Sequence, residues 1–144
     1  FPLDEGWNEL KYRDLASEFQ PEHRKQWAKY WLDTIGRGEP VPRAIDLTLT
    51  LLELADDIRF AGVSGELLTD MGLKIKRHLG KEITLPLGYT NGVVAYIPDS
   101  GVLGDGGYEA IESIYFCRTM PAPWQKDIDT TMLSAFDDLM KTLA

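Results

Sequence analysis

Three residues carry side chains that could do chemistry where a pocket is expected: Glu66, Tyr96 and Tyr108. The Glu66 carboxylate is a hard oxygen donor that can coordinate a metal ion at the end of a buried strand. The Tyr96 phenol could form a pocket wall, donate a proton or, once deprotonated, bind a metal. Tyr108 follows two glycines that permit close backbone approach, so its hydroxyl could donate to a developing oxyanion.

Each of the first two residues also has a purely structural explanation. Glu66 is expected in the first turn of a helix, where the macrodipole stabilises a carboxylate by about 0.3–1 kcal/mol. Tyr96 lies in an apolar extended run before Pro98, where an aromatic ring packs on a sheet and keeps its hydroxyl at the rim. Residue types and spacing alone leave these alternatives open.

Other common catalytic arrangements are not indicated. His23 and His78 fall on different predicted helices without ligand spacing, and we expect a solvated His23 and a capping or surface His78. The sequence contains no G-x-S-x-G elbow, and the glycines at 101–107 precede no lysine followed by serine or threonine. The single cysteine, Cys117, cannot form an internal disulfide.

The composition predicts one globular domain over residues 1–144. The hydrophobic fraction is 44% and the charged fraction 26%, an ordinary balance for a folded chain. A net charge of −8 argues against a nucleic-acid partner. The sequence has no apolar run of about 18 residues, so we expect no transmembrane segment. The chain begins with Phe1 instead of Met, so we expect a piece of a longer protein whose compartment the sequence does not fix.

Hydrophobic periodicity predicts the elements that position these residues. An aromatic stripe, Trp27/Tyr30/Trp31, should pack the second helix against a sheet. Ser64 is the expected N-cap of the helix that carries Glu66. The expected elements are helices at 8–19 and 21–35, a hairpin of strands 45–54 and 58–63, a helix from Ser64 to Gly80, a strand at 83–87, an extended run at 93–97, a loop at 98–107, a strand at 108–116 and a final helix at 128–143.

This order predicts an α/β (α+β) fold with a mixed sheet and flanking helices. If the strands on either side of the Ser64–Gly80 helix are parallel, the connection between them should be right-handed.

Three segments in this order resemble the C-terminal part of the neutral/alkaline non-lysosomal ceramidase family, and most closely its divergent bacterial members. They are Val63 to Gly72, Gly88 to Pro98 and Gly106 to Ala110, and the resemblance covers about residues 20–116. It implies that the chain is part of a larger catalytic domain of a zinc-dependent amidase, a class that hydrolyses the N-acyl bond of ceramide.

In that family two histidines, a glutamate and a tyrosine hold the zinc. The resemblance places the glutamate on Glu66, the tyrosine on Tyr96 and an oxyanion-stabilising tyrosine on Tyr108. The family's histidine ligands and nucleophile region lie upstream of the matching segments. The resemblance therefore implies that zinc binds only in the full-length parent, that the rest of the parent is this chain's partner, and that the fragment alone is inactive.

Two further expectations follow from the resemblance. Asp99-Ser100-Gly101 and Gly107 replace a threonine- and tyrosine-rich stretch and an arginine of true ceramidases, so another lipid or N-acyl amide could be the substrate. Family members often act outside the cytoplasm, which suggests by analogy a secreted or periplasmic parent.

The alternative is a non-catalytic α/β interaction domain that uses the aromatic helix face. The amidase hypothesis makes the sharper demand, because it requires the Glu66 carboxylate and the Tyr96 hydroxyl to converge on one hollow.

Overall fold

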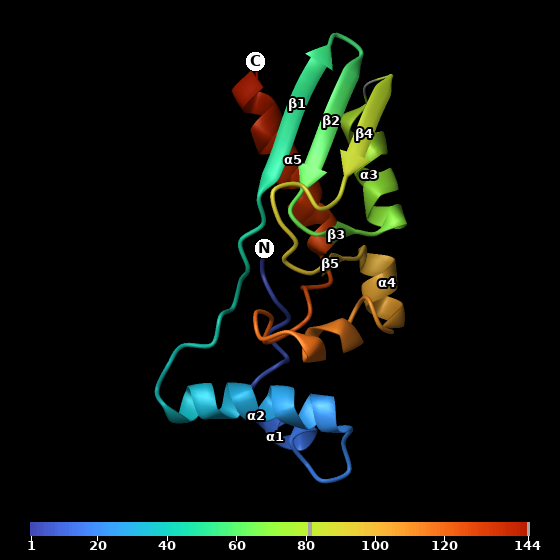
Figure 1. Ribbon diagram of the computed structural model, residues 1–144. Coiled ribbons are helices and arrows are strands. Elements are labelled where there is room, and N and C mark those ends of the chain that lie inside the picture. Colours follow the sequence, from blue (N-terminus) through green and yellow to red (C-terminus); the bar gives the residue numbers. More distant parts are fainter. Residues whose placement is uncertain (81, 144) are drawn as a thin grey trace.

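The fold is α+β, with a three-stranded mixed sheet covered on one face by two helices (Figure 1). The computed structural model describes residues 1–80 and 82–143. The sheet order is β1-β2-β4, in which β1 (Leu49–Ala55) is antiparallel to β2 (Ile58–Val63) and β2 is parallel to β4 (Ile83–Leu87). Helices α3 (Thr69–Leu79) and α5 (Ile128–Leu143) pack on this sheet and on each other. The predicted fold class, hairpin and final helix are confirmed, although β1 begins at Leu49 and not at residue 45.

A second, two-stranded sheet lies between the main sheet and the N-terminal helices (Figure 1). It pairs β3 (Glu66–Leu67) with β5 (Tyr96–Ile97) in parallel. The expected helix start at Ser64 is therefore wrong, because α3 begins only at Thr69. The Ser64 hydroxyl accepts a hydrogen bond of 2.7 Å from the Thr48 N–H instead of capping a helix. Glu66 consequently lies on a strand and not in a first helical turn.

The segment after β5 also differs from expectation. Residues 98–107 are not all loop, because α4 (Ser100–Asp105) forms there and the Asp99 side chain accepts from the Val102 N–H at 2.9 Å. The strand predicted at 108–116 is replaced by a turn and the 3-10 helix η1 (Glu112–Phe116). Here the Ser113 N–H bonds to the Tyr108 carbonyl at 2.9 Å. Such local hydrogen bonds satisfy the backbone, so no strand partner is needed.

The N-terminal helices α1 (Glu9–Leu15) and α2 (Glu22–Gly36) pack together at the end of the molecule opposite the main sheet (Figure 1). The aromatic stripe of α2 does not pack against a sheet as expected. Trp27 instead contacts the rings of Trp7, Tyr12 and Tyr115 edge-on, and its indole N–H donates to the Met120 carbonyl at 3.2 Å. The helical pair is thus joined to the η1 segment by an aromatic core.

No helix in the two described ranges has the length and apolar character needed to span a bilayer.

The packing of α3 makes a direct stability prediction. Ile75 is fully buried (0% exposed), whereas Leu73 on the same helix is 44% exposed. Ile75→Ala should lower the free energy of unfolding by about 2–5 kcal/mol, because it leaves a cavity between helix and sheet. Leu73→Ala is the matched control and should cost far less; equal losses in urea denaturation would contradict this packing.

Candidate active site

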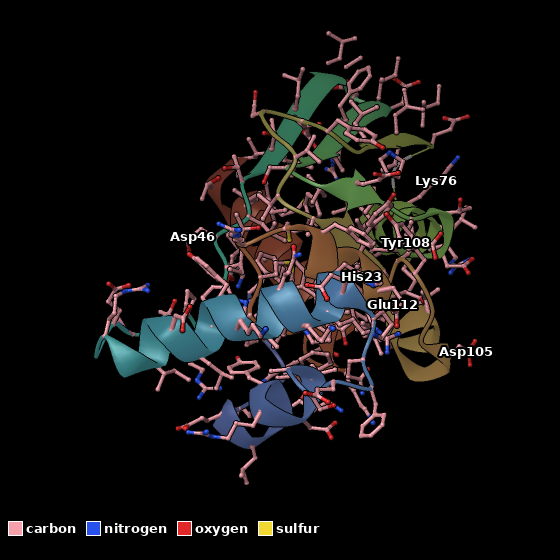
Figure 2. All side chains as sticks on the ribbon, turned by 60° about the horizontal axis from the view of Figure 1, so that its bottom comes forward. His23, Asp46, Lys76, Asp105, Tyr108 and Glu112 are labelled. Carbon is pink, nitrogen blue, oxygen red and sulfur yellow. The ribbon has the colours of Figure 1, made fainter. Side chains whose placement is uncertain are left out.

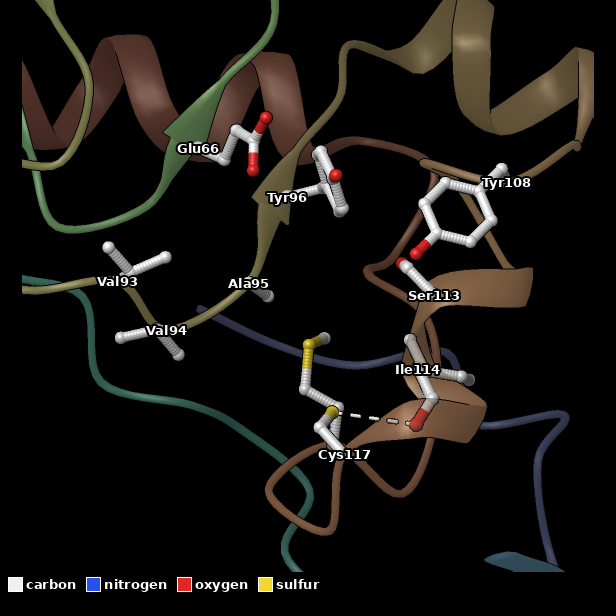
Figure 3. Close-up of a pocket in the computed structure, with 10 residues that line it drawn as sticks. Glu66, Val93, Val94, Ala95, Tyr96, Tyr108, Ser113, Ile114 and Cys117 are labelled. Carbon is white, nitrogen blue, oxygen red and sulfur yellow. Dashed lines mark hydrogen bonds between the residues drawn. The ribbon is translucent and has the colours of Figure 1, made fainter. Parts of the chain in front are cut away.

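The β3–β5 pairing sets two of the three candidate side chains next to each other. Glu66 and Tyr96 are direct partners in the parallel register. The Glu66 N–H donates to the Ala95 carbonyl at 2.8 Å, and the Leu68 N–H donates to the Ile97 carbonyl at 3.2 Å. Residues paired in this way direct their side chains to the same face of a sheet. Figure 3 shows the two side chains side by side.

This pairing depends on the absence of a side chain at Gly65. A Cβ at Gly65 would lie 2.5 Å from Cγ1 of Ile97 and 2.9 Å from the Ala95 carbonyl oxygen. Both distances are shorter than real contacts, so a larger residue would push β5 away from β3. Gly88 is also close, because its added Cβ would lie 3.1 Å from the Gly65 carbonyl oxygen.

Glu66 and Tyr96 open onto a hollow of about 150 Å³ that Tyr108 also lines. The Tyr108 ring lies 5.9 Å from the Tyr96 ring at an angle of 74°, and it is 50% exposed, which places it at the rim. The rest of the lining is mainly apolar (Figure 3): Val93, Val94, Ala95, Ser113, Ile114, Cys117 and Met120. The structure therefore brings all three sequence-predicted residues to one hollow with a polar edge and an apolar wall.

A fourth polar residue, Tyr89, reaches the same carboxylate. A hydrogen bond with Glu66 is the main cause that raises the pKa of Tyr89. Burial, followed by the negative charge of Glu66, raises the pKa of Tyr96. Sequence reasoning missed Tyr89 because it falls between the strand predicted at 83–87 and the extended run predicted at 93–97. Its left-handed backbone (φ 57°) turns the chain back toward β3.

A polar cluster fixes the chain immediately after Tyr96. The Lys74 ammonium binds both Asp99, at 2.7 Å, and Asp129. Asp129 also accepts from the N–H and the hydroxyl of Ser100, at 2.8 and 2.7 Å. Burial alone would raise the pKa of both carboxyls, but the hydrogen bonds from Lys74 and from neighbouring donors outweigh it and lower both values. Helices α3, α4 and α5 are thus joined next to β5.

Neither histidine lies in this hollow. The Nε2 atom of His78 is 2.7 Å from Asp137, so it links α3 to α5 at the surface. His23 is not simply solvated as expected, because its ring is half-buried and stacks on Phe116 at 4.8 Å. Within residues 1–80 and 82–143, no three His, Cys, Asp or Glu side chains are grouped closely enough to hold a metal ion.

The donor set nevertheless fits part of a zinc site. A carboxylate and a phenol on adjacent strands offer two oxygen donors from one side of a hollow, and zinc in proteins accepts oxygen as well as nitrogen and sulfur ligands. A tetrahedral site needs further donors, which the described residues do not add.

Comparison of the chain with protein-family models, with curated proteins and with solved structures finds no match.

The close approach at Gly65 can be tested by substitution. Gly65→Ala should destabilise the fold by about 1–3 kcal/mol, because the new methyl group overlaps Ile97 and the Ala95 carbonyl. Gly104→Ala is the matched control, because nothing lies within 4 Å of a Cβ there; it should stabilise α4 by roughly 0.5–1 kcal/mol. Thermal denaturation that shows no loss for Gly65→Ala would exclude the tight β3–β5 contact.

The electrostatic coupling predicts how two tyrosines titrate. A neighbouring negative charge disfavours a phenolate, so removing it in Glu66→Gln should lower the pKa of Tyr89 and Tyr96. The fall should be larger for Tyr89, because burial remains the main cause at Tyr96. Carbon NMR of the tyrosine Cζ atoms against pH measures both values.

The control for this titration is Glu109→Gln. Glu109 is the weakest contributor at Tyr96 and does not contribute at Tyr89. If the pKa of Tyr89 is the same in Glu66→Gln and the parent protein, the coupling is absent.

Proposed function

We propose that this chain is the C-terminal portion of a zinc-dependent amidase that resembles the neutral ceramidases and hydrolyses an N-acyl amide bond. The observation that carries the proposal is the register pairing of Glu66 with Tyr96 beside a hollow that Tyr108 also lines. The sequence resemblance assigns these three residues to one site, although they come from three separate segments of the chain.

In this proposal the Glu66 carboxylate and the Tyr96 phenol hold the metal. When bound, zinc would supply Lewis-acid activation of water and of the amide carbonyl. The hydroxyl of Tyr108, at the rim, would donate a hydrogen bond to the developing oxyanion. Tyr89 would orient the Glu66 carboxylate, since the two interact directly.

The shape of the hollow supports an amide with an apolar substituent. Val93, Val94, Ile114 and Met120 line it opposite the polar edge. Such an apolar wall favours an acyl chain as the substituent, because it offers no charge to attract a polar substituent. A lipid or another N-acyl amide is therefore the proposed substrate class.

Two features support the proposal that the chain belongs to a larger domain. The described residues supply two metal donors and no histidine at the hollow. The main sheet also contains a parallel strand pair, yet the side chains of Ile83, Leu85 and Leu87 on its uncovered face are 41, 39 and 42% exposed. Parallel strands are normally covered on both faces. The remainder of the parent chain is the proposed cover and the proposed source of the missing ligands.

The alternative, an interaction domain that uses the aromatic face of α2, gains no specific support. Trp27 and Trp31 are each 3% exposed and pack inside the molecule. Only Tyr30 of the stripe remains half-exposed.

The metal assignment predicts distinct results for three substitutions in the longer parent protein. Glu66→Gln and Tyr96→Phe should each lower zinc content, measured by mass spectrometry of the purified protein. They should lower N-acyl amide hydrolysis by at least the roughly 10–100-fold that loss of an outer-shell partner costs. Tyr108→Phe should retain zinc but lower kcat by about 10²–10³-fold, because it removes an oxyanion donor.

Glu109→Gln is the control and should change neither quantity. Full zinc content and activity in Glu66→Gln would refute the ligand assignment. Hydrolysis of N-acyl amides by the 144-residue chain alone with added zinc would refute the proposal that its site is incomplete.

A further inference from the structure

A second hollow, of about 230 Å³, lies between α2 and the end of the η1 segment. Its lining comes from the first turns of α2 and from the residues that follow Ile114: His23, Gln26, Trp27, Tyr115, Phe116, Cys117 and Arg118. Cys117 lines both hollows, so the two are neighbours. Neither the proposed metal site nor the aromatic core requires this second hollow.

Its polar lining includes one cation, Arg118, and two side chains that can donate hydrogen bonds, Gln26 and His23. In the part of the chain that the structure describes, Arg118 forms no ion pair, although the chain carries 23 acidic residues. Four other arginines do pair with carboxylates: Arg13, Arg24, Arg37 and Arg59. The Arg118 guanidinium lies instead 5.1 Å from the centre of the Tyr30 ring. Stacking on an aromatic face leaves the guanidinium edge free to bind an anion.

Gln26 and His23 also favour an anionic ligand in this hollow. The Gln26 amide donates one hydrogen to Glu22 at 3.1 Å, which leaves its second hydrogen for a ligand. His23 stacks flat on Phe116, at an angle of 11°, so the edge of its ring carries its polar atoms. Asp33 lines an adjoining hollow together with Lys29 and Arg118 and does not line this one.

The floor of the hollow is aromatic. Trp27 and Tyr115 contact each other at 5.2 Å and are buried, so their ring positions are fixed by packing. Phe116 is 64% exposed and forms the rim with His23. Flat ring surfaces next to a guanidinium suit a planar group that carries an acid.

An aromatic track joins the two hollows. The Tyr108 ring lies 5.9 Å from Tyr96 and 6.4 Å from Phe116, and both Tyr108 and Phe116 are exposed. Figure 2 shows Tyr108, His23 and Glu112 on the same side of the molecule. A ligand seated in the second hollow could therefore extend along Tyr108 toward Glu66.

From this arrangement we propose that the second hollow binds the carboxylate end of an aromatic or N-acyl carboxylic acid, with Arg118 as the anion-binding residue. The inference rests on the proposed function only in linking this subsite to an amide substrate, which would then be anionic at its far end. Binding of the acid itself needs neither zinc nor the rest of the parent protein.

The probe is hippurate, N-benzoylglycine, and its matched control is the uncharged hippuramide. NMR titration of the 144-residue chain follows the Trp27 indole N–H and the Arg118 guanidinium N–H. Hippurate should bind about tenfold or more tightly than hippuramide, because a hydrogen bond to a charged group adds more than one neutral bond. Arg118→Gln should abolish this preference, whereas Arg37→Gln, whose arginine pairs with Glu39 at the other end of α2, should preserve it.

Equal affinity for the two probes, or an unchanged preference in Arg118→Gln with an intact spectrum, would overturn the proposal. Glu66→Gln separates the two proposals, because it should leave hippurate binding unchanged while it removes zinc from the parent. Absence of any preference for hippurate in the unsubstituted chain, with zinc binding intact in the parent, would refute the second hollow alone. Retained acid binding with zinc content unchanged in Glu66→Gln would refute the metal site alone.

Discussion

The pairing of β3 with β5 is the constraint on which the candidate site depends. Each strand has only two residues, so a few backbone hydrogen bonds must hold Glu66 opposite Tyr96. Short strands of this kind are marginal by themselves and need support from packing. Here the support comes from the missing side chain at Gly65 and from the Lys74 cluster that joins three helices next to Tyr96. The Trp124 indole adds a hydrogen bond of 2.8 Å to the Tyr96 carbonyl.

The same geometry determines the protonation of the phenols around Glu66. One carboxylate faces two phenols. A hydrogen bond with Glu66 is the main cause that raises the pKa of Tyr89, and burial, followed by the charge of Glu66, raises the pKa of Tyr96. Both phenols are therefore protonated at neutral pH, and the isolated site favours hydrogen bonding around Glu66. A divalent cation would reverse this balance, because positive charge lowers the pKa of a coordinated group. If Glu66 and Tyr96 hold a metal ion as proposed, binding would release a proton from Tyr96, because a coordinating phenol must be deprotonated.

Sequence patterns predicted the elements that depend on long hydrophobic periods and on strong stop signals. The β1–β2 hairpin and α5 belong to this group, as does the end of α3 at Gly80, which has a left-handed backbone. Patterns failed where tertiary hydrogen bonds overrode local preference: Ser64 bonds to Thr48 instead of capping a helix. The glycines in residues 98–107 favoured a loop over α4, although Asp99 is a typical N-cap residue.

The convergence of Glu66, Tyr96 and Tyr108 could be anticipated only from the family resemblance. The second hollow could not be anticipated at all, because His23 and Arg118 are far apart in sequence.

The central claim is that Glu66 and Tyr96 bind one metal ion. Diffraction data from crystals of the longer parent protein, collected on both sides of the zinc absorption edge, test it most directly. We predict an anomalous peak about 2.0–2.2 Å from a Glu66 carboxylate oxygen and within bonding distance of the Tyr96 hydroxyl. A zinc ion bound elsewhere in that protein, with neither oxygen in its coordination shell, would contradict it.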